Sequence, residues 1–375
     1  MIRNNMIIKN AKVFIDGQFH DYDVRTENGI ITEIANRIDG EGFDAEGKYL
    51  FAGFIDVHFH GACDAYCGDS IEKMEEIART IPQYGVTGYI PTPIVKNDEE
   101  SKHRVRTIRK SKNLPGAQVL GMFIYSFYRH RSIPYYPKSI IPTKEDTLDL
   151  IDGTFDDIIA ILYAPELDPD RSWTRWVREN GAFPLIGFTE GTAKDVHDAV
   201  AAGARLTDHY PNGFPMLDHH VSSAVLQCLH EDDLYLQLNG DCIHVSPEFI
   251  RMMIKCKGAD HIVGVSDSSP LMGKPEGEYH FLDKIVYIKD GAVRDAEGKL
   301  VTGCHTFDEN MRTMLANGFS LETIGKIFSE NAADAYMLND RGKIEVGRRA
   351  DLVVMNKDLF VEKTMINGEW FYEKD

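Results

Sequence analysis

The chain has 375 residues, of which 43% are hydrophobic, 27% charged and 10% aromatic, a composition typical of a globular protein with a large core. Its formal net charge of -18 argues against a nucleic-acid-binding surface and means that an anionic ligand must be met by local basic residues. The length fits one large domain of barrel size together with a small one.

The six cysteines show no paired CxxC motifs, so neither a structural zinc site nor a disulfide framework is expected. The opening residues, MIRNNMIIKN, lack the apolar core of a signal peptide, and no apolar run approaches the roughly 18 residues of a membrane span. We therefore expect a cytoplasmic protein that binds neither nucleic acid nor a membrane.

The two ends of the sequence are rich in predicted β-structure. Residues 1–50 alternate apolar and polar side chains and contain hairpin signals such as Asp16-Gly17. Residues 340–375 return to short strands, with a turn at Asn367-Gly368. The two segments are expected to pair with each other into one small composite β-sandwich, which would be a discontinuous domain.

Between these ends, strand-like runs alternate with helical stretches. The clearest helix is SPEFIRMMIKCKG, where Ser246 can cap, Pro247 fits the first helical position and Gly258 ends the helix. Eight strands predict an α/β fold, a (β/α)8 TIM barrel over residues 51–339, with more helices after the eighth strand. The expected strands are 54–60, 86–92, 118–126, 157–164, 183–189, 205–210, 234–240 and 261–267.

Polar side chains gather where several of these strands end. The first strand ends in FIDVHFHG, whose His58 and His60 are two residues apart and share a face. The sixth strand ends at His209 and the eighth at Asp267. Because barrel active sites lie at the carboxyl ends of the strands, these four side chains are expected to meet.

Imidazole and carboxylate are suitable ligands for a divalent metal, either zinc or, equally by ligand type, iron, manganese or nickel. Such an ion lowers the pKa of a bound water, and Asp267 could pass the water's proton to a leaving group. This pattern predicts a hydrolase with Asp267 and His209 as catalytic residues and with His58, His60, Asp267 and His209 as candidate metal ligands.

The chain resembles the amidohydrolase superfamily and, within it, the N-acetylglucosamine-6-phosphate deacetylases, over almost its full length. FAGFIDVHFHG is similar to that family's PGFIDxHxHG, YGVTGYIPT to GVTxxxPT, GDCIHVSPE to DGxHxxPE, and GRRADLVVMN to GxxADLVVLD. The resemblance implies a metal-dependent hydrolase that removes the acetyl group of an N-acetyl amino sugar phosphate, and a homodimer.

Two positions depart from the family pattern at the metal site. The family has a ligand Glu in GxHLEGPF, where this chain has Tyr125 in GMFIYSFY, and a ligand His in GHS, where this chain has Phe188 in GFT. The family's third ligand at that site corresponds to His209. A phenyl ring cannot bind zinc and a neutral tyrosine is a poor ligand, so at most one ion is expected, held by His58, His60 and Asp267.

The resemblance also assigns residues to the substrate. These are His244, Asn212, Gly213 and His220, the last standing where the family has a phosphate-binding Arg; the basic turn YRHRS adds Arg129 and Arg131. Two alternatives stay open. One is an amidohydrolase acting on a cyclic amide or amine, and the other is an inactive relative that binds a sugar phosphate.

Overall fold

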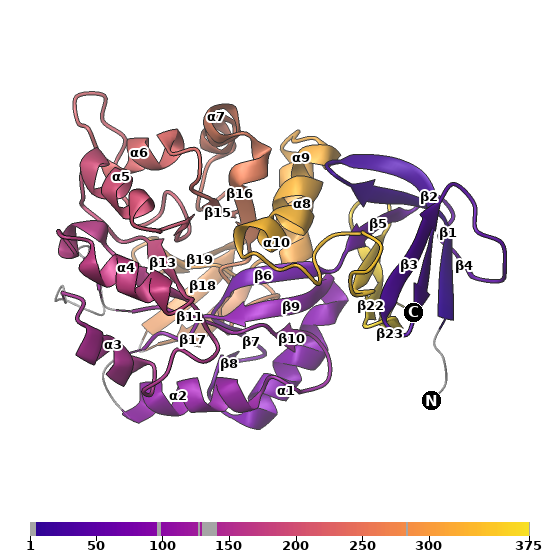
Figure 1. Cartoon of the computed structure of the whole chain (residues 1–375), viewed down its shortest axis with the longest axis horizontal. Helices are drawn as coiled ribbons and strands as arrows, with labels where there is room; N and C mark the ends of the chain where they lie inside the picture. The colour runs from indigo at the N-terminus through magenta and orange to yellow at the C-terminus, as the bar shows by residue number, and fades with distance from the viewer. Residues whose placement is uncertain (1–4, 96–98, 127, 130–140, 283, 375) are drawn as a thin grey trace.

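The computed structural model describes residues 5–95, 99–126, 128–129, 141–282 and 284–374. A barrel of parallel strands surrounded by helices occupies most of the molecule, and a separate sheet stands at one side of it (Figure 1). The predicted fold class, a (β/α)8 barrel with a small β domain, is confirmed.

The barrel strands pair in parallel, in chain order. The hydrogen-bonded ladder is interrupted at three places, between β10 and β11, between β14 and β15 and between β16 and β6. Single bridges, Ile94 to Tyr125, Leu206 to Tyr235 and Phe59 to Ser268, continue the circle there. The strands are β6 (Phe54–Phe59), β9 (Val86–Pro91), β10 (Gln118–Val119), β11 (Met122–Ile124), β12 (Ile158–Tyr163), β13 (Phe183–Ile186), β14 (Leu206–Thr207), β15 (Leu236–Asn239) and β16 (Ile262–Val265).

The expected third strand, 118–126, is divided into β10 and β11. The break comes at Gly121, whose φ of 152° belongs to a region that side-chain-bearing residues rarely adopt. A Cβ there would also lie 2.6 Å from the Ile159 side chain. The interruption therefore follows from a close approach between neighbouring strands that the apolar run alone did not predict.

Alternating side chains of the barrel strands fill two different layers. Along β12, Ala160 and Leu162 belong to the apolar cluster inside the barrel, whereas Ile161 and Tyr163 belong to the cluster between the strands and the helices. This period of two is the pattern expected of a strand buried on both faces. The apolar core is therefore interrupted where the strands end, by the polar residues there.

Helices follow the barrel strands, and α7 shows the predicted boundaries: Ser246 Oγ accepts a hydrogen bond from Phe249 N, and Gly258 ends the helix. The α-helices are α1 (Ile71–Thr80), α2 (Glu99–Lys110), α3 (Lys144–Leu150), α4 (Ser172–Glu179), α5 (Ala193–Ala201), α6 (Ala224–His230), α7 (Pro247–Lys257), α8 (Phe307–Ala316), α9 (Leu321–Gly325) and α10 (Asn331–Ala335). Short helical turns are η1 (Ile81–Tyr84), η2 (Pro165–Leu167), η3 (Ala259–His261) and the π-type η4 (Lys326–Glu330).

The small sheet joins early and late strands of the chain. Its order is β23-β22-β21-β5-β1-β2-β3, with β4 paired to β1, and the indigo β1–β4 lie beside the yellow β22 and β23 (Figure 1). Its strands are β1 (Asn5–Ile15), β2 (Gln18–Glu27), β3 (Ile30–Ala35), β4 (Phe43–Asp44), β5 (Tyr49–Ala52), β21 (Leu352–Met355), β22 (Val361–Ile366) and β23 (Glu369–Glu373).

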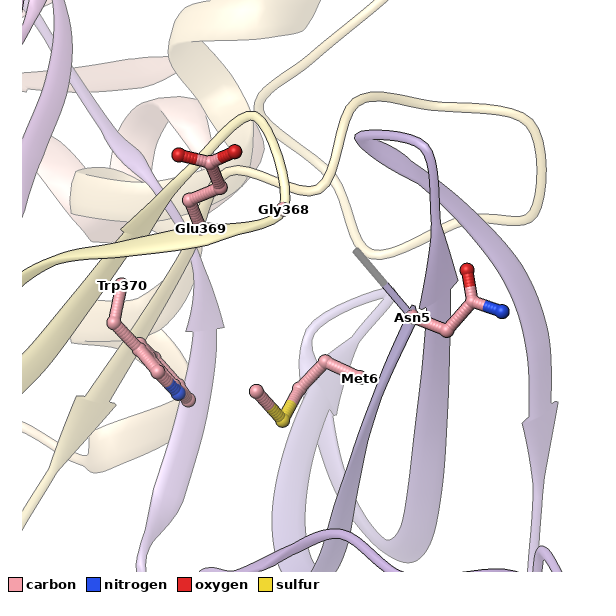
Figure 2. A pocket seen from close by; sticks show the side chains of 5 residues that line it. All are labelled: Asn5, Met6, Gly368, Glu369 and Trp370. Carbon is pink, nitrogen blue, oxygen red and sulfur yellow. The ribbon is translucent and has the colours of Figure 1, made fainter. Parts of the chain in front are cut away.

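A hollow of about 260 Å³ lies in this small sheet. Figure 2 shows its lining, with the Met6 and Trp370 side chains reaching into the same space. The other lining residues are Asn5, Gly368 and Glu369. None of these residues belongs to the predicted site, which lies at the barrel.

A second antiparallel sheet, not predicted from the sequence, stands between the eighth barrel strand and α8, where helices alone were expected. Its strands are β17 (Gly277–Phe281), β18 (Lys284–Lys289), β19 (Ala292–Asp295) and β20 (Leu300–Thr302). Asp290-Gly291 makes its central turn, a hairpin signal of the kind used at the two chain ends. A short ribbon of β7 (Gly61–Ala62) and β8 (Ala65–Tyr66) follows the first barrel strand.

Candidate active site

His58, His60 and Asp267 lie together, as their places at the ends of β6 and β16 predict. His58 is fully buried, whereas His60 and Asp267 are partly exposed, at 12% and 15% of their side chains. The Nε2 atoms of the two imidazoles are 3.0 Å apart, and Asp267 Oδ1 lies 3.4 Å from His58 Nε2 and 3.5 Å from His60 Nε2. We refer to these three residues as the triad.

Hydrogen bonds behind the triad determine where each imidazole carries its proton. His58 Nδ1 lies 2.9 Å from Gln237 Oε1, and His60 Nδ1 lies 2.7 Å from the carbonyl oxygen of Thr92. Both oxygens can only accept a hydrogen bond, so both Nδ1 atoms donate. The two Nε2 lone pairs therefore face each other and Asp267 Oδ1, which is unfavourable unless a cation lies among them.

The triad fits a divalent ion. Around a tetrahedral ion with bonds of about 2.0–2.1 Å, neighbouring ligand atoms are about 3.3 Å apart, close to the three separations of 3.0, 3.4 and 3.5 Å observed here. Donation from Nδ1 to a protein oxygen is also the usual way in which a metal-binding histidine is oriented. Three ligands leave one position of a tetrahedron for water or substrate.

The protonation states of the triad suit this role. Burial lowers the pKa of His58 to about 4, so the ring is neutral at physiological pH, as a metal ligand must be. Burial alone would raise the pKa of Asp267, but its electrostatic interactions with the neighbouring imidazoles of His58, His60 and His209 hold it well below its ordinary value. Asp267 is thus an ionised carboxylate.

Two residues after the ends of barrel strands have a strained backbone. Asp267 has a φ of 48° and Phe188 a φ of 47°, the left-handed region that residues other than glycine rarely adopt. For a bulky phenylalanine this conformation is a true outlier. Such strain persists only where the surrounding structure enforces it, and it concentrates at functional sites.

The side of the site next to the triad is aromatic. Tyr125, just after β11, packs its ring 5.0 Å from that of His60 and 5.8 Å from that of Phe188. Its hydroxyl lies 3.2 Å from His209 Nε2, and burial keeps the pKa of this phenol well above its ordinary value. Tyr125 and Phe188 stand at the positions that correspond to metal ligands in the resembled family.

His209 stands apart from the triad ligands. Its ring stacks 5.5 Å from that of His58, its Nε2 is engaged with Tyr125, and its Nδ1 has no hydrogen-bond partner among the described residues. It is not part of the group whose ligand atoms lie close enough to share one ion. Its geometry is that of a neighbour to the bound substrate or ion, and its role as a ligand stays a prediction.

Asp208 is a fully buried carboxylate beside these histidines. Its Oδ1 lies 3.3 Å from His58 Nδ1 and its Oδ2 lies 3.4 Å from His209 Nε2. Neither oxygen has a hydrogen-bond partner in the described part of the chain. A buried carboxylate needs positive charge nearby, and this requirement is one reason why the site would favour cations.

The predicted substrate-binding residues fall into two groups. His244 is held by Asp241, whose Oδ2 lies 2.5 Å from His244 Nδ1. Gly213 packs on Phe188, since a Cβ at this glycine would lie 3.1 Å from that ring, and Asn212 donates its backbone N–H to the carbonyl of His209. Asn212 and Gly213 therefore connect to the site, and His244 lies near enough to Asp267 for that carboxylate to raise its pKa.

The remaining candidates differ. His220 is exposed on a loop and contacts Asp218 and His219, an exposed group that the structure does not connect with the triad. Arg129 is buried, not a solvated turn residue, and lies over the rings of Tyr125 and Phe188. Arg131 lies outside the described residues.

Comparison with known proteins agrees with this geometry. The Amidohydrolase family matches residues 276–371. N-acetylglucosamine-6-phosphate deacetylase of Lysinibacillus sphaericus is 27% identical over 97% of each chain, and N-acetylgalactosamine-6-phosphate deacetylase of Escherichia coli O157:H7 is 24% identical over 94% of this chain and 96% of its own. The crystal structure of the Pasteurella multocida N-acetylglucosamine-6-phosphate deacetylase superposes with a TM-score of 0.89 at 25% identity, covering 99% of this chain and 100% of its own.

The chain is an amidohydrolase that resembles the N-acetylglucosamine-6-phosphate deacetylases. Among the described residues, no helix of this amidohydrolase is long and apolar enough to cross a membrane.

Sequence reasoning missed the residues that support the triad. Gln237 in β15, Thr92 after β9 and Asp208 after β14 orient or surround the two imidazoles. A polar residue such as Gln237 in the otherwise apolar run LYLQLNG is the signal that could have indicated one of them. Their partners could not be known before the strands were placed around the barrel.

Proposed function

We propose that this amidohydrolase hydrolyses the amide bond of an N-acetyl amino sugar phosphate with one divalent ion, zinc by the preference of its ligand set, held by His58, His60 and Asp267. The observation that carries the proposal is the meeting of two Nε2 lone pairs and one carboxylate oxygen at tetrahedral separations. The relatives that act on acetylated amino sugar phosphates match nearly the whole chain.

When bound, the ion lowers the pKa of a water and polarises a carbonyl oxygen. Asp267, ionised and with Oδ1 directed at the two imidazoles, offers Oδ2 to receive the proton of the attacking water. The same oxygen then returns the proton to the leaving nitrogen, so that the acid and base steps share one group.

The other residues orient the substrate. His209 stands beside His58, where it can donate to the carbonyl oxygen of the amide, and Tyr125 holds its Nε2. The contact with Asp241 raises the pKa of His244 despite its burial. A histidine with a raised pKa carries positive charge more readily, which suits an anionic substrate. Asn212, Gly213 and Arg131 complete the proposed set, and Arg129 acts through the rings of Tyr125 and Phe188.

The first test is metal content. The protein, purified without added metal or chelator, is expected to contain about one divalent ion per chain by elemental analysis, and a His58→Ala, His60→Ala double variant none. The matched control replaces the exposed pair His219 and His220 by alanine and should keep the ion. Deacetylation of N-acetylglucosamine 6-phosphate, followed by acetate release, should disappear with the ion.

Other results would redirect the proposal. An ion without acetate release on acetylated amino sugar phosphates would favour a cyclic amide or amine as substrate. Absence of any ion, even after reconstitution, would contradict the hydrolase and favour a sugar-phosphate-binding relative.

The cellular setting and assembly belong to the same proposal. All six cysteines are free, which supports a reducing, cytoplasmic compartment. Similarity to the deacetylases supports a homodimer, which sedimentation equilibrium would test.

A further inference from the structure

Arg129 is a buried cation that lies over the two rings on the aromatic side of the site. Only 2% of its surface is exposed. Its Cζ lies 5.4 Å from the centre of the Tyr125 ring and 5.2 Å from the centre of the Phe188 ring. Because an arginine side chain stays protonated in proteins, the charge is permanent.

The two rings form a corner around this charge. Tyr125 and Phe188 meet edge to face, at 86°, with their centres 5.8 Å apart. A cation within about 6 Å of a ring centre is attracted by the ring's negative face. Two rings at right angles therefore fix the guanidinium from two directions.

The same two rings also contact the histidines of the metal centre. Tyr125 packs against His60 of the triad, and Phe188 packs against His209 at 5.3 Å. The guanidinium and the histidines are therefore neighbours of the same two rings. In a buried site, charges placed in this way interact more strongly than in water.

Neither ring of this corner can hold a second metal ion. A phenyl ring has no donor atom, and the hydroxyl of Tyr125 is already engaged with His209, 3.2 Å from its Nε2. The buried carboxylate of Asp208, which lies near both Tyr125 and the histidines, still requires a compensating positive charge.

We propose that Arg129 is the second cation of this active site, a covalently attached charge that limits the centre to one metal ion and offsets the negative charge that builds up on the substrate during hydrolysis. The inference rests on the proposed metal site. Arg129 acts across Tyr125 and Phe188, so it is a positioning residue whose charge is felt through them.

The proposal gives two effects of opposite sign for Arg129→Met. Loss of the repelling charge should tighten binding of the triad's ion, by about tenfold for a charge beside the same two rings. Loss of the stabilising charge should lower kcat, also by about tenfold, with a smaller change in KM. A residue that only packs the two rings would weaken both metal binding and turnover.

The experiment titrates metal-free protein with Zn²⁺ by calorimetry and measures kcat and KM on N-acetylglucosamine 6-phosphate. Arg129→Lys, which keeps the charge, should bind Zn²⁺ as the parent does. The matched control is Arg178→Met, because Arg178 lies over Phe183 at 4.5 Å, at the opposite end of the same strand β13 that leads to Phe188. It should change neither value.

The zinc affinity and kcat of Arg129→Met together support or overturn the proposed role of Arg129. Tighter zinc binding with lower kcat in Arg129→Met supports the proposal, whereas unchanged or weaker zinc binding overturns it. If that variant does not fold, the parent protein still tests the limit to one ion, since a second equivalent of Zn²⁺ bound at the barrel would contradict it. Failure of the parent to bind any ion would instead contradict the proposed function.

Discussion

The two sides of the active site treat positive charge in different ways. The triad of His58, His60 and Asp267 presents lone pairs that require a cation from solution. Beside the triad, Tyr125 and Phe188 present no ligand and surround the guanidinium of Arg129. Equivalent strand ends of one barrel can therefore meet the need for positive charge either with a metal ion or with a side chain.

The largest expected effect is on kcat and comes from a substitution in the triad. Asp267→Asn removes the only carboxylate of the triad and its ability to take a proton, so kcat should fall by about 10²–10⁴. Steady-state acetate release measures it, with metal content determined on the same sample. An active variant would show that the proton is transferred elsewhere, and Asp218→Asn, at the exposed histidine group, is the control.

A substitution on the aromatic side should lower the stability of the protein more than its catalytic rate. Tyr125→Phe leaves the ring but removes the hydroxyl next to His209 Nε2, and an unpartnered buried polar atom costs about 1–3 kcal/mol. We expect a lower Tm with the single metal ion retained. Loss of the ion in this variant would mean that the phenol contributes to metal binding. The aromatic side would then also supply a ligand, as the triad does.

The smallest expected effect concerns the ion pair of Asp241 and His244. The pKa of His244 is raised and that of Asp241 is lowered by their contact, with Asp267 and Arg294 the other charges that act on His244. The contribution of His244 is therefore present below about pH 6.5 and is lost as pH rises through its folded-state pKa, while that of Asp241 is lost as pH falls below about 3.8.

His244→Gln should therefore lower Tm by about 1–3 °C more at pH 6 than at pH 9. Thermal unfolding followed by circular dichroism measures the difference. The ion pair of Asp241 and His244 involves no metal ion, so a chelator should leave the difference in Tm between the two pH values unchanged. A deficit that is equal at both pH values would show that His244 is neutral in the folded protein.

Much of the site could be predicted because it lies at strand ends. The alternation in FIDVHFHG puts His58 and His60 on one side, and barrel geometry brings Asp267 to them from the eighth strand. These predictions need only the alternation of side chains along a strand and the closure of the eight strands into a barrel. The absence of family ligands at Tyr125 and Phe188 was visible in the sequence too.

Other features depended on packing that no pattern shows. Arg129 lies in a basic turn and was assigned to the substrate from the sequence, and the structure buries it against two rings. The sheet of β17–β20 was missed although Asp290-Gly291 is a turn signal, because helical periodicity dominates the sequence that follows it. Gly121 interrupts the third strand because of a neighbour that is distant in the sequence, Ile159.

The strand order of the small sheet has a consequence for synthesis on the ribosome. β5, which ends at Ala52, pairs with β21, which begins at Leu352, so 299 residues of chain lie between the two partners. At about 5–20 residues per second, the edge of β5 waits roughly 15–60 s for its neighbour while the barrel is still being made. An unpaired edge invites pairing with other chains, so the nascent protein is most exposed to misassembly during this interval, and slower translation would lengthen it.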